Sequence, residues 1–140
     1  MISIYIDCNI LIDWLLKREP YSFYAAKIIE LTENKKVKSY LSVLTLANTH
    51  YIISKELNKK IADEFLVDSL KLFDFVDITG EIIRKAIINK SKDFEDDLHY
   101  YTAIDQPIDY IITRNKKDFP KDKIKIVDLE EFIESNILEI

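Results

Sequence analysis

Short alternating segments and longer helical segments follow one another along the chain. Residues 2–6 alternate isoleucine with Ser3 and Tyr5, a pattern that predicts a strand rich in β-branched residues. From Asn9 onward apolar residues recur at helical spacing, and they predict a helix that Asn9 caps. Asp7 lies between these two segments. In an open α/β sheet, ligands bind at the carboxyl ends of the strands, so Asp7 is the first candidate for a site.

The same alternation of strand and helix patterns continues along the rest of the chain. Further strands are predicted at residues 37–41, 73–76, 109–112 and 123–127. Further helices are predicted at residues 22–34, 42–57, 60–73, 81–87, 98–104 and 129–137. Short strands separated by helices predict an α/β fold with a parallel, doubly wound sheet of about five short strands.

Composition narrows the chemistry that this fold can support. With 140 residues, 48% of them hydrophobic and 32% charged, the chain is predicted to form one globular domain over residues 1–140. A single glycine excludes glycine-rich phosphate loops and the dinucleotide fingerprint. One cysteine and two histidines exclude a multi-cysteine zinc site and a histidine-rich metal centre. Any metal is therefore expected to be a hard ion held by oxygen, such as Mg²⁺ or Mn²⁺.

Charge and hydropathy indicate where the protein works. The net charge of −5 argues against nucleic-acid binding by the whole surface, although a local basic rim beside an acidic site is compatible with it. The chain does not start with a basic segment followed by an apolar core, and it has no apolar run of about 18 residues. We therefore expect a cytoplasmic protein that does not bind membranes.

The densest acidic run extends from Asp93 to Asp97. If residues 93–104 are helical, Asp93 lies about 40° from Asp97 and about 60° from Asp96 around the axis, while Glu95 points to solvent. Carboxylates within a few ångströms repel one another unless a cation neutralises them, and a divalent ion also suits phosphodiester hydrolysis by an activated water. Acids in a first helical turn also complement the helix dipole, so a purely structural role stays open.

Four stretches in this order resemble the motifs of the PIN domain (PilT N-terminus) family, the metal-dependent ribonucleases that include the VapC-type toxins. Residues 4–13 resemble the first motif, aspartate-x-asparagine followed by apolar residues. Residues 42–48 resemble the second motif, serine-x-x-threonine-x-x-glutamate. Residues 93–103 resemble the third, in which an aspartate opens a helix, and residues 111–119 resemble the fourth, at the end of a late strand.

The resemblance implies an α/β/α sandwich around a parallel sheet and an Mg²⁺ or Mn²⁺ ion held by acids. It assigns metal binding and catalysis to Asp7, Asp96 and Asp93, although Asp93 can equally be a helix cap. Asn48 departs from the family pattern, because most active members have glutamate there. An amide oxygen can ligate Mg²⁺, but it brings no charge and cannot act as a base. The further candidates for polar site residues are Asn48, Asp97, Asn115 and Asp118.

Taken with the acids, the resemblance predicts an endoribonuclease that hydrolyses RNA phosphodiester bonds, as the toxin of a toxin–antitoxin pair. An antitoxin protein and a homodimer are the partners that it implies besides RNA. Arg114, Lys116 and Lys117 are the candidates for contacts with RNA phosphates. His50 and His99 are predicted to be isolated, with structural or surface roles.

Two other functions stay open. Asn48 is compatible with a catalytically weak or inactive PIN-like module that binds RNA or a protein partner. A phosphotransfer domain on a similar sheet is the third hypothesis. Against it, Asn9 stands where haloacid-dehalogenase phosphatases need a second aspartate.

Overall fold

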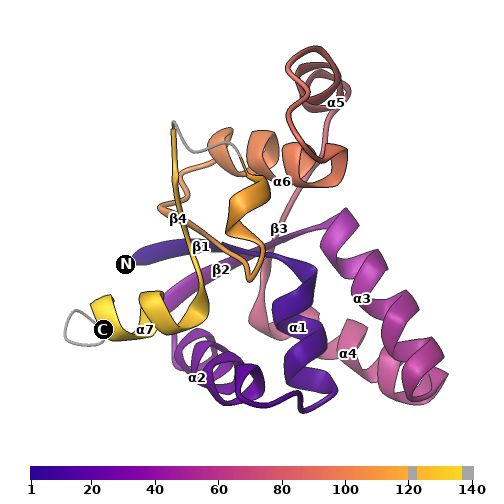
Figure 1. Ribbon diagram of the computed structural model, residues 1–140. Coiled ribbons are helices and arrows are strands. Elements are labelled where there is room, and N and C mark those ends of the chain that lie inside the picture. The colour runs from indigo at the N-terminus through magenta and orange to yellow at the C-terminus, as the bar shows by residue number, and fades with distance from the viewer. Residues whose placement is uncertain (120–122, 137–140) are drawn as a thin grey trace.

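Parallel strands form a sheet in the order β3-β2-β1-β4-β5 (Figure 1). The computed structural model describes residues 1–119 and 123–136, without the side chains of Asp118 and Asn136. The strands in these ranges are β1 (Ile2–Ile6), β2 (Val37–Ser42), β3 (Asp74–Val76), β4 (Tyr110–Ile112) and β5 (Lys125–Val127). Each predicted strand is present, so the prediction of a parallel, doubly wound α/β sheet is confirmed.

Helices connect these strands and follow the last one. They are α1 (Cys8–Leu15), α2 (Tyr21–Glu33), α3 (Val43–Glu56), α4 (Lys59–Leu72), α5 (Gly80–Ile88), α6 (Phe94–Ile104) and α7 (Leu129–Asn136), with a 3-10 turn, η1, at Lys116–Asp118. Within the described residues, none of these helices combines the length and apolarity that crossing a membrane requires.

The predicted starts of α1 and α6 are wrong by more than one residue, and side-chain caps explain both. Asp7, not Asn9, caps α1, because its carboxylate accepts the backbone N–H of Cys8. Helix α6 begins at Phe94, four residues before the predicted start, because the Asp93 side chain accepts the N–H of Asp96. An acidic side chain that satisfies a free N–H group extends a helix toward its N-terminus.

Alternate residues of β1 point to opposite faces of the sheet and enter two separate cores. Ile4 and Ile6 pack with Leu11 of α1 and with residues of α2, α4 and α7. Tyr5 packs with Tyr100 of α6 on the other face. Figure 1 shows α6 on one side of the sheet, with α5 beyond it, and α1 and α2 on the opposite side. Both faces of the sheet are therefore covered, as in the predicted α/β/α sandwich.

The chain changes its direction across the sheet beside β1. It passes from β1 through β2 to β3 at one edge, and it then returns to β4 on the other side of β1. The strand register pairs Ile6 with Ile112. Asp7 and Thr113, the next residues along, therefore lie side by side at the carboxyl ends of β1 and β4. Such a switch point is where open α/β sheets bind ligands.

Candidate active site

Asp7 is buried at the switch point, with only 4% of its surface exposed. Its Oδ1 accepts the backbone N–H of Cys8 at 2.7 Å, and its Oδ2 accepts the Thr113 hydroxyl at 2.8 Å. The start of α1 and the end of β4 thus fix both oxygens, and the positive end of the α1 dipole favours the carboxylate charge. Asp7 is a helix cap, and the same geometry holds its carboxylate rigidly at the sheet edge.

A hydrogen-bonded network connects Asp7 to the acidic start of α6. Asp96 is 7% exposed, and its Oδ2 lies 3.5 Å from the amide Nδ2 of Asn115. The backbone N–H of Asn115 donates to the Thr113 hydroxyl at 3.0 Å, and that hydroxyl donates to Asp7. Residues from the first, third and fourth predicted motifs therefore meet at one place, although up to 108 positions separate them along the chain.

His99 is a residue whose contacts the sequence prediction missed. It is fully buried on α6, with Nδ1 2.5 Å from the Tyr5 hydroxyl. The Tyr5 hydroxyl in turn donates to Ser42 at 2.8 Å. The Nε2 atom of His99 lies 3.6 Å from Asp7 Oδ1 and 3.7 Å from Glu95 Oε1. The prediction that His99 is isolated is therefore wrong, and its spacing of four residues from Glu95 was the available signal. The same prediction is wrong for His50, whose Nε2 lies 2.8 Å from Asp63 Oδ1.

Glu95 is exposed, as predicted, but its carboxylate also contacts neighbouring side chains. Its Oε1 accepts a hydrogen bond from Asn48 Nδ2 at 3.1 Å, and its side chain is 48% exposed. Nearby His99, and to a smaller extent Asn48, lower the pKa of Glu95 below its usual range, although burial acts in the opposite direction. The helical angles within α6 do not take account of α3, which brings Asn48 to the side of α6 that carries Glu95.

The sequence of this chain is similar to that of a known protein family. The sequence model described as "PIN domain" matches residues 3–117. The chain belongs to the PIN domain family. No curated protein matches this PIN domain in sequence. The match to residues 3–117 confirms the predicted family.

Solved structures of several proteins share the fold of this PIN domain. The sarcin–ricin loop cleaving toxin VapC20 of Mycobacterium tuberculosis has a TM-score of 0.64 at 13% identity, over 78% of this chain and 87% of that chain. DNA-bound VapBC from Salmonella typhimurium has a TM-score of 0.66 at 18% identity, over 92% and 99%. FitAcB from Neisseria gonorrhoeae has a TM-score of 0.63 at 17% identity, over 91% and 98%.

Two further acids, Asp93 and Asp97, accept hydrogen bonds near the start of α6. Asp93 is exposed and caps α6, with Oδ1 3.0 Å from the N–H of Asp96. Asp97 is fully buried, and its two oxygens accept the backbone N–H and the hydroxyl of Ser91, at 2.9 and 2.5 Å. Asp97 therefore fixes the segment before α6. The side chain of Asp118 lies outside the described residues.

The three basic candidates occupy different surroundings in this PIN domain. Arg114 places Nε 2.8 Å from Oδ2 of the buried Asp13. Lys116 forms ion pairs with Glu131 and, at 3.6 Å, with Asp128. Lys117 is exposed. RNA contact stays a prediction for all three, and Arg114 and Lys116 would have to share their charge with these acids.

The acids of the PIN domain fit a hydrated hard ion better than a fully protein-ligated one. Among residues 1–119 and 123–136, no three His, Cys, Asp or Glu side chains form a group that could hold a metal ion. Asp7 and Asp96 provide two buried carboxylates. Mg²⁺ usually keeps several waters and is bound by one or two carboxylates together with substrate phosphates. The buried Oδ1 of Asn9 has no hydrogen-bond partner in the described structure, so it is also available to a water or an ion.

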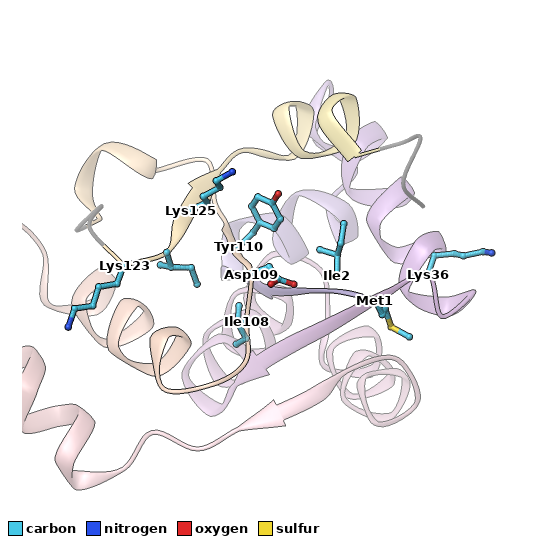
Figure 2. A pocket seen from close by; sticks show the side chains of 9 residues that line it. Met1, Ile2, Lys36, Ile108, Asp109, Tyr110, Lys123 and Lys125 are labelled. Atoms are coloured by element: carbon cyan, nitrogen blue, oxygen red, sulfur yellow. The ribbon is translucent and has the colours of Figure 1, made fainter.

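A pocket at the opposite ends of the strands does not belong to this site. It encloses about 690 Å³, and Met1, Asp109 and three lysines help to line it. Figure 2 shows Lys36, Lys123 and Lys125 pointing away from one another, so their charges do not converge. None of the predicted site residues lines this pocket.

Proposed function

We propose that this PIN domain is a metal-dependent endoribonuclease. The observation that carries the proposal is the pairing of two buried carboxylates, Asp7 and Asp96, through Thr113 and Asn115 at the switch point of the sheet. Two carboxylates on separate elements repel each other, and a divalent cation offsets this repulsion. PIN domain nucleases as a class use divalent ions, and we propose Mg²⁺ or Mn²⁺ here because the donors are oxygens.

The protein's own residues would hold the reacting groups in place. Asp7 and Asp96 would hold the ion, with Asp93 adding negative charge nearby. When bound, the ion supplies Lewis-acid chemistry, because it lowers the pKa of a water and offsets charge on the phosphate. Thr113 keeps Asp7 in one orientation through its hydroxyl, and Asn115 does the same for Asp96. Lys117 is the exposed cation that we propose for the RNA backbone.

We also propose a physiological setting, the toxin of a toxin–antitoxin pair. The relatives with this fold include a sarcin–ricin loop cleaving toxin and VapBC bound to DNA. An antitoxin protein would accordingly be the partner of this chain, and RNA in the cytoplasm its substrate. A homodimer is part of the same proposal. Co-expression with a neighbouring small DNA-binding protein and co-purification of the two would test it.

Metal-dependent RNA cleavage by the purified protein tests the catalytic proposal. With Mn²⁺ the parent should cut RNA and EDTA should stop it, whereas Asp7→Asn and Asp96→Asn should each abolish cleavage because each removes one of the two carboxylates. Asp68→Asn, at an exposed position of α4, is the matched control and should cut as the parent does. If Asp7→Asn and Asp96→Asn also cut RNA at the parent's rate, the proposal is wrong.

Asn48 favours the second candidate, an inactive PIN-like module that binds RNA or a protein. On that hypothesis the parent shows no metal-dependent cleavage, and Asn48→Glu creates it by restoring the usual acid. On our proposal the parent is active. Asn48→Glu alone then brings no gain, because the new carboxylate would face Glu95, which now lies within hydrogen-bond distance of Asn48.

A further inference from the structure

The side chain of Asn48 ends on a carboxylate from another helix. Its amide Nδ2 donates to Glu95 Oε1 at 3.1 Å, which joins α3 to the first turn of α6. Position 48 is the place where this chain lacks the acid of the second motif. A negative charge is nevertheless present within hydrogen-bond distance of that side chain. The charge comes from α6 instead of α3.

A buried nitrogen shows that Glu95 and Asp7 face a common point. His99 Nε2 is fully buried and has no hydrogen-bond partner in the described structure. It lies between the two acids, 3.6 Å from Asp7 Oδ1 and 3.7 Å from Glu95 Oε1. Its other nitrogen is anchored on Tyr5 of the central strand, so the ring cannot turn away without losing that contact. The polar atoms of β1, α3 and α6 thus converge beside Asp7.

The neighbouring acids Asp93 and Asp97 do not direct a free carboxylate oxygen toward His99 Nε2 in the same way. Both oxygens of Asp97 accept hydrogen bonds from Ser91, and Oδ1 of Asp93 caps α6. The Oε1 atom of Glu95 instead accepts the hydrogen bond from Asn48 Nδ2 at 3.1 Å and lies 3.7 Å from His99 Nε2, so its carboxylate is directed toward this point.

We propose that Glu95 supplies the carboxylate that the chain lacks at Asn48, with Asn48 and His99 as the residues that position it toward Asp7. The inference rests on the proposed function, since it assigns Glu95 to the same divalent cation. The described structure has no three acids close enough to ligate one ion, so Glu95 would act through water held by the ion and would not be a direct ligand. In this chain the acid of the second motif is then supplied by Glu95 of α6 and not by residue 48 of α3.

Isothermal titration of the purified chain with Mn²⁺ tests this assignment without relying on activity. Glu95→Gln should weaken Mn²⁺ binding by about 10- to 100-fold, the usual cost of losing an outer-shell partner of a metal site. Glu81→Gln removes an exposed first-turn acid from the neighbouring helix α5, and it should bind as the parent does. The exchange variant Asn48→Glu/Glu95→Gln returns the acid to α3, and it should regain most of the lost affinity.

The outcomes separate this inference from the proposed function. Asp7→Asn is measured alongside, because it removes the central carboxylate of the proposed site. If Asp7→Asn loses binding while Glu95→Gln binds like the parent, the Glu95 assignment is overturned and the proposed site stands. If Glu81→Gln weakens Mn²⁺ binding as much as Glu95→Gln does, the effect comes from the overall negative charge of the protein. The Glu95 assignment is then also overturned. An exchange variant as weak as Glu95→Gln contradicts the replacement of Asn48. If Asp7→Asn binds as the parent does, the proposed function itself fails.

Discussion

Single acids of this PIN domain differ in what each carboxylate oxygen does. Both oxygens of Asp7 are fixed by neighbours, and both oxygens of Asp97 are taken up by Ser91. Asp93 is exposed, and its Oδ1 caps α6. The hypothesis that Asp93 is a helix cap depends on the position of its side-chain oxygen. The hypothesis that it belongs to the metal site depends on its negative charge. Substitutions that change only one of these properties can separate them.

Asp93→Asn keeps a side-chain oxygen that can cap α6 and removes the charge. We expect its free energy of unfolding to stay close to the parent's, whereas Asp93→Ala should lose about 1 kcal/mol with the cap. If Asp93 contributes charge to the site, both variants should bind Mn²⁺ more weakly. Chemical denaturation and Mn²⁺ titration of the two variants measure these effects. Normal Mn²⁺ affinity in both would leave Asp93 as a helix cap alone.

The sequence was sufficient to single out Asp7 and Asp96 as candidates, because Asp7 lies between a strand and a helix and Asp96 lies in an acidic run before a helix. Their role in a metal site stays a prediction. The sequence was not sufficient for Glu95 and His99. Their contacts are with Asn48 and Tyr5, which come from α3 and β1. Helical angles within α6 describe only one partner of each contact. Similarly, a count of acids cannot show that Asp97 faces Ser91.

At the level of elements, a buried ion pair joins α1 to the segment after β4. Asp13 of α1 is fully buried, and Arg114 contacts it through Nε at 2.8 Å and Nη2 at 3.1 Å. Arg18 lies 3.8 Å from the same carboxylate. Burial raises the pKa of Asp13 above its usual value, while Arg114 and Arg18 act to lower it. Arg114 therefore holds together the two elements that carry Asp7 and Thr113.

Arg114→Met should destabilise the protein by about 3 kcal/mol at neutral pH, because it leaves a buried carboxylate with a weaker partner. It should also raise the pKa of Asp13 further, so the folded state takes up a proton at a higher pH than the unfolded state does. Stability then rises as the pH falls through the raised pKa, and the deficit shrinks on acidification.

Urea unfolding of the parent and of Arg114→Met at neutral and at acidic pH measures this deficit. The double variant Asp13→Asn/Arg114→Met is the control, and it should show a smaller deficit with little dependence on pH. An equal deficit for Arg114→Met at both pH values would contradict the role assigned to Asp13.

The types of the elements followed well from hydrophobic periodicity, and some of their ends did not. Apolar alternation in residues 2–6 and helical spacing after Asp7 are local properties that the sequence shows directly. The start of α6 depended on which acid caps the helix, and Asp93 does so earlier in the chain than the apolar pattern indicates. The turn η1 lies in a polar segment after β4, so no hydrophobic periodicity in the sequence predicts it.

At the scale of the whole molecule, strand order explains why distant residues form one site. The central strand β1 pairs with β2 on one side and with β4 on the other. The order along the sheet could not be obtained from the sequence, because it depends on how the segment after β3 crosses back to β4. Once that crossing is known, Asp7 and Thr113 must be neighbours, and α6 covers the face that Tyr5 enters. We propose that a divalent ion binds where Asp7 and Asp96 meet, at the carboxyl ends of these strands.

Anomalous diffraction from a crystal of the protein soaked in Mn²⁺ tests that claim most directly. We expect an anomalous peak beside the carboxylates of Asp7 and Asp96, with water completing the coordination, and no such peak in a crystal of Asp7→Asn. A peak elsewhere on the molecule, with none at Asp7 and Asp96, would contradict the proposed metal site.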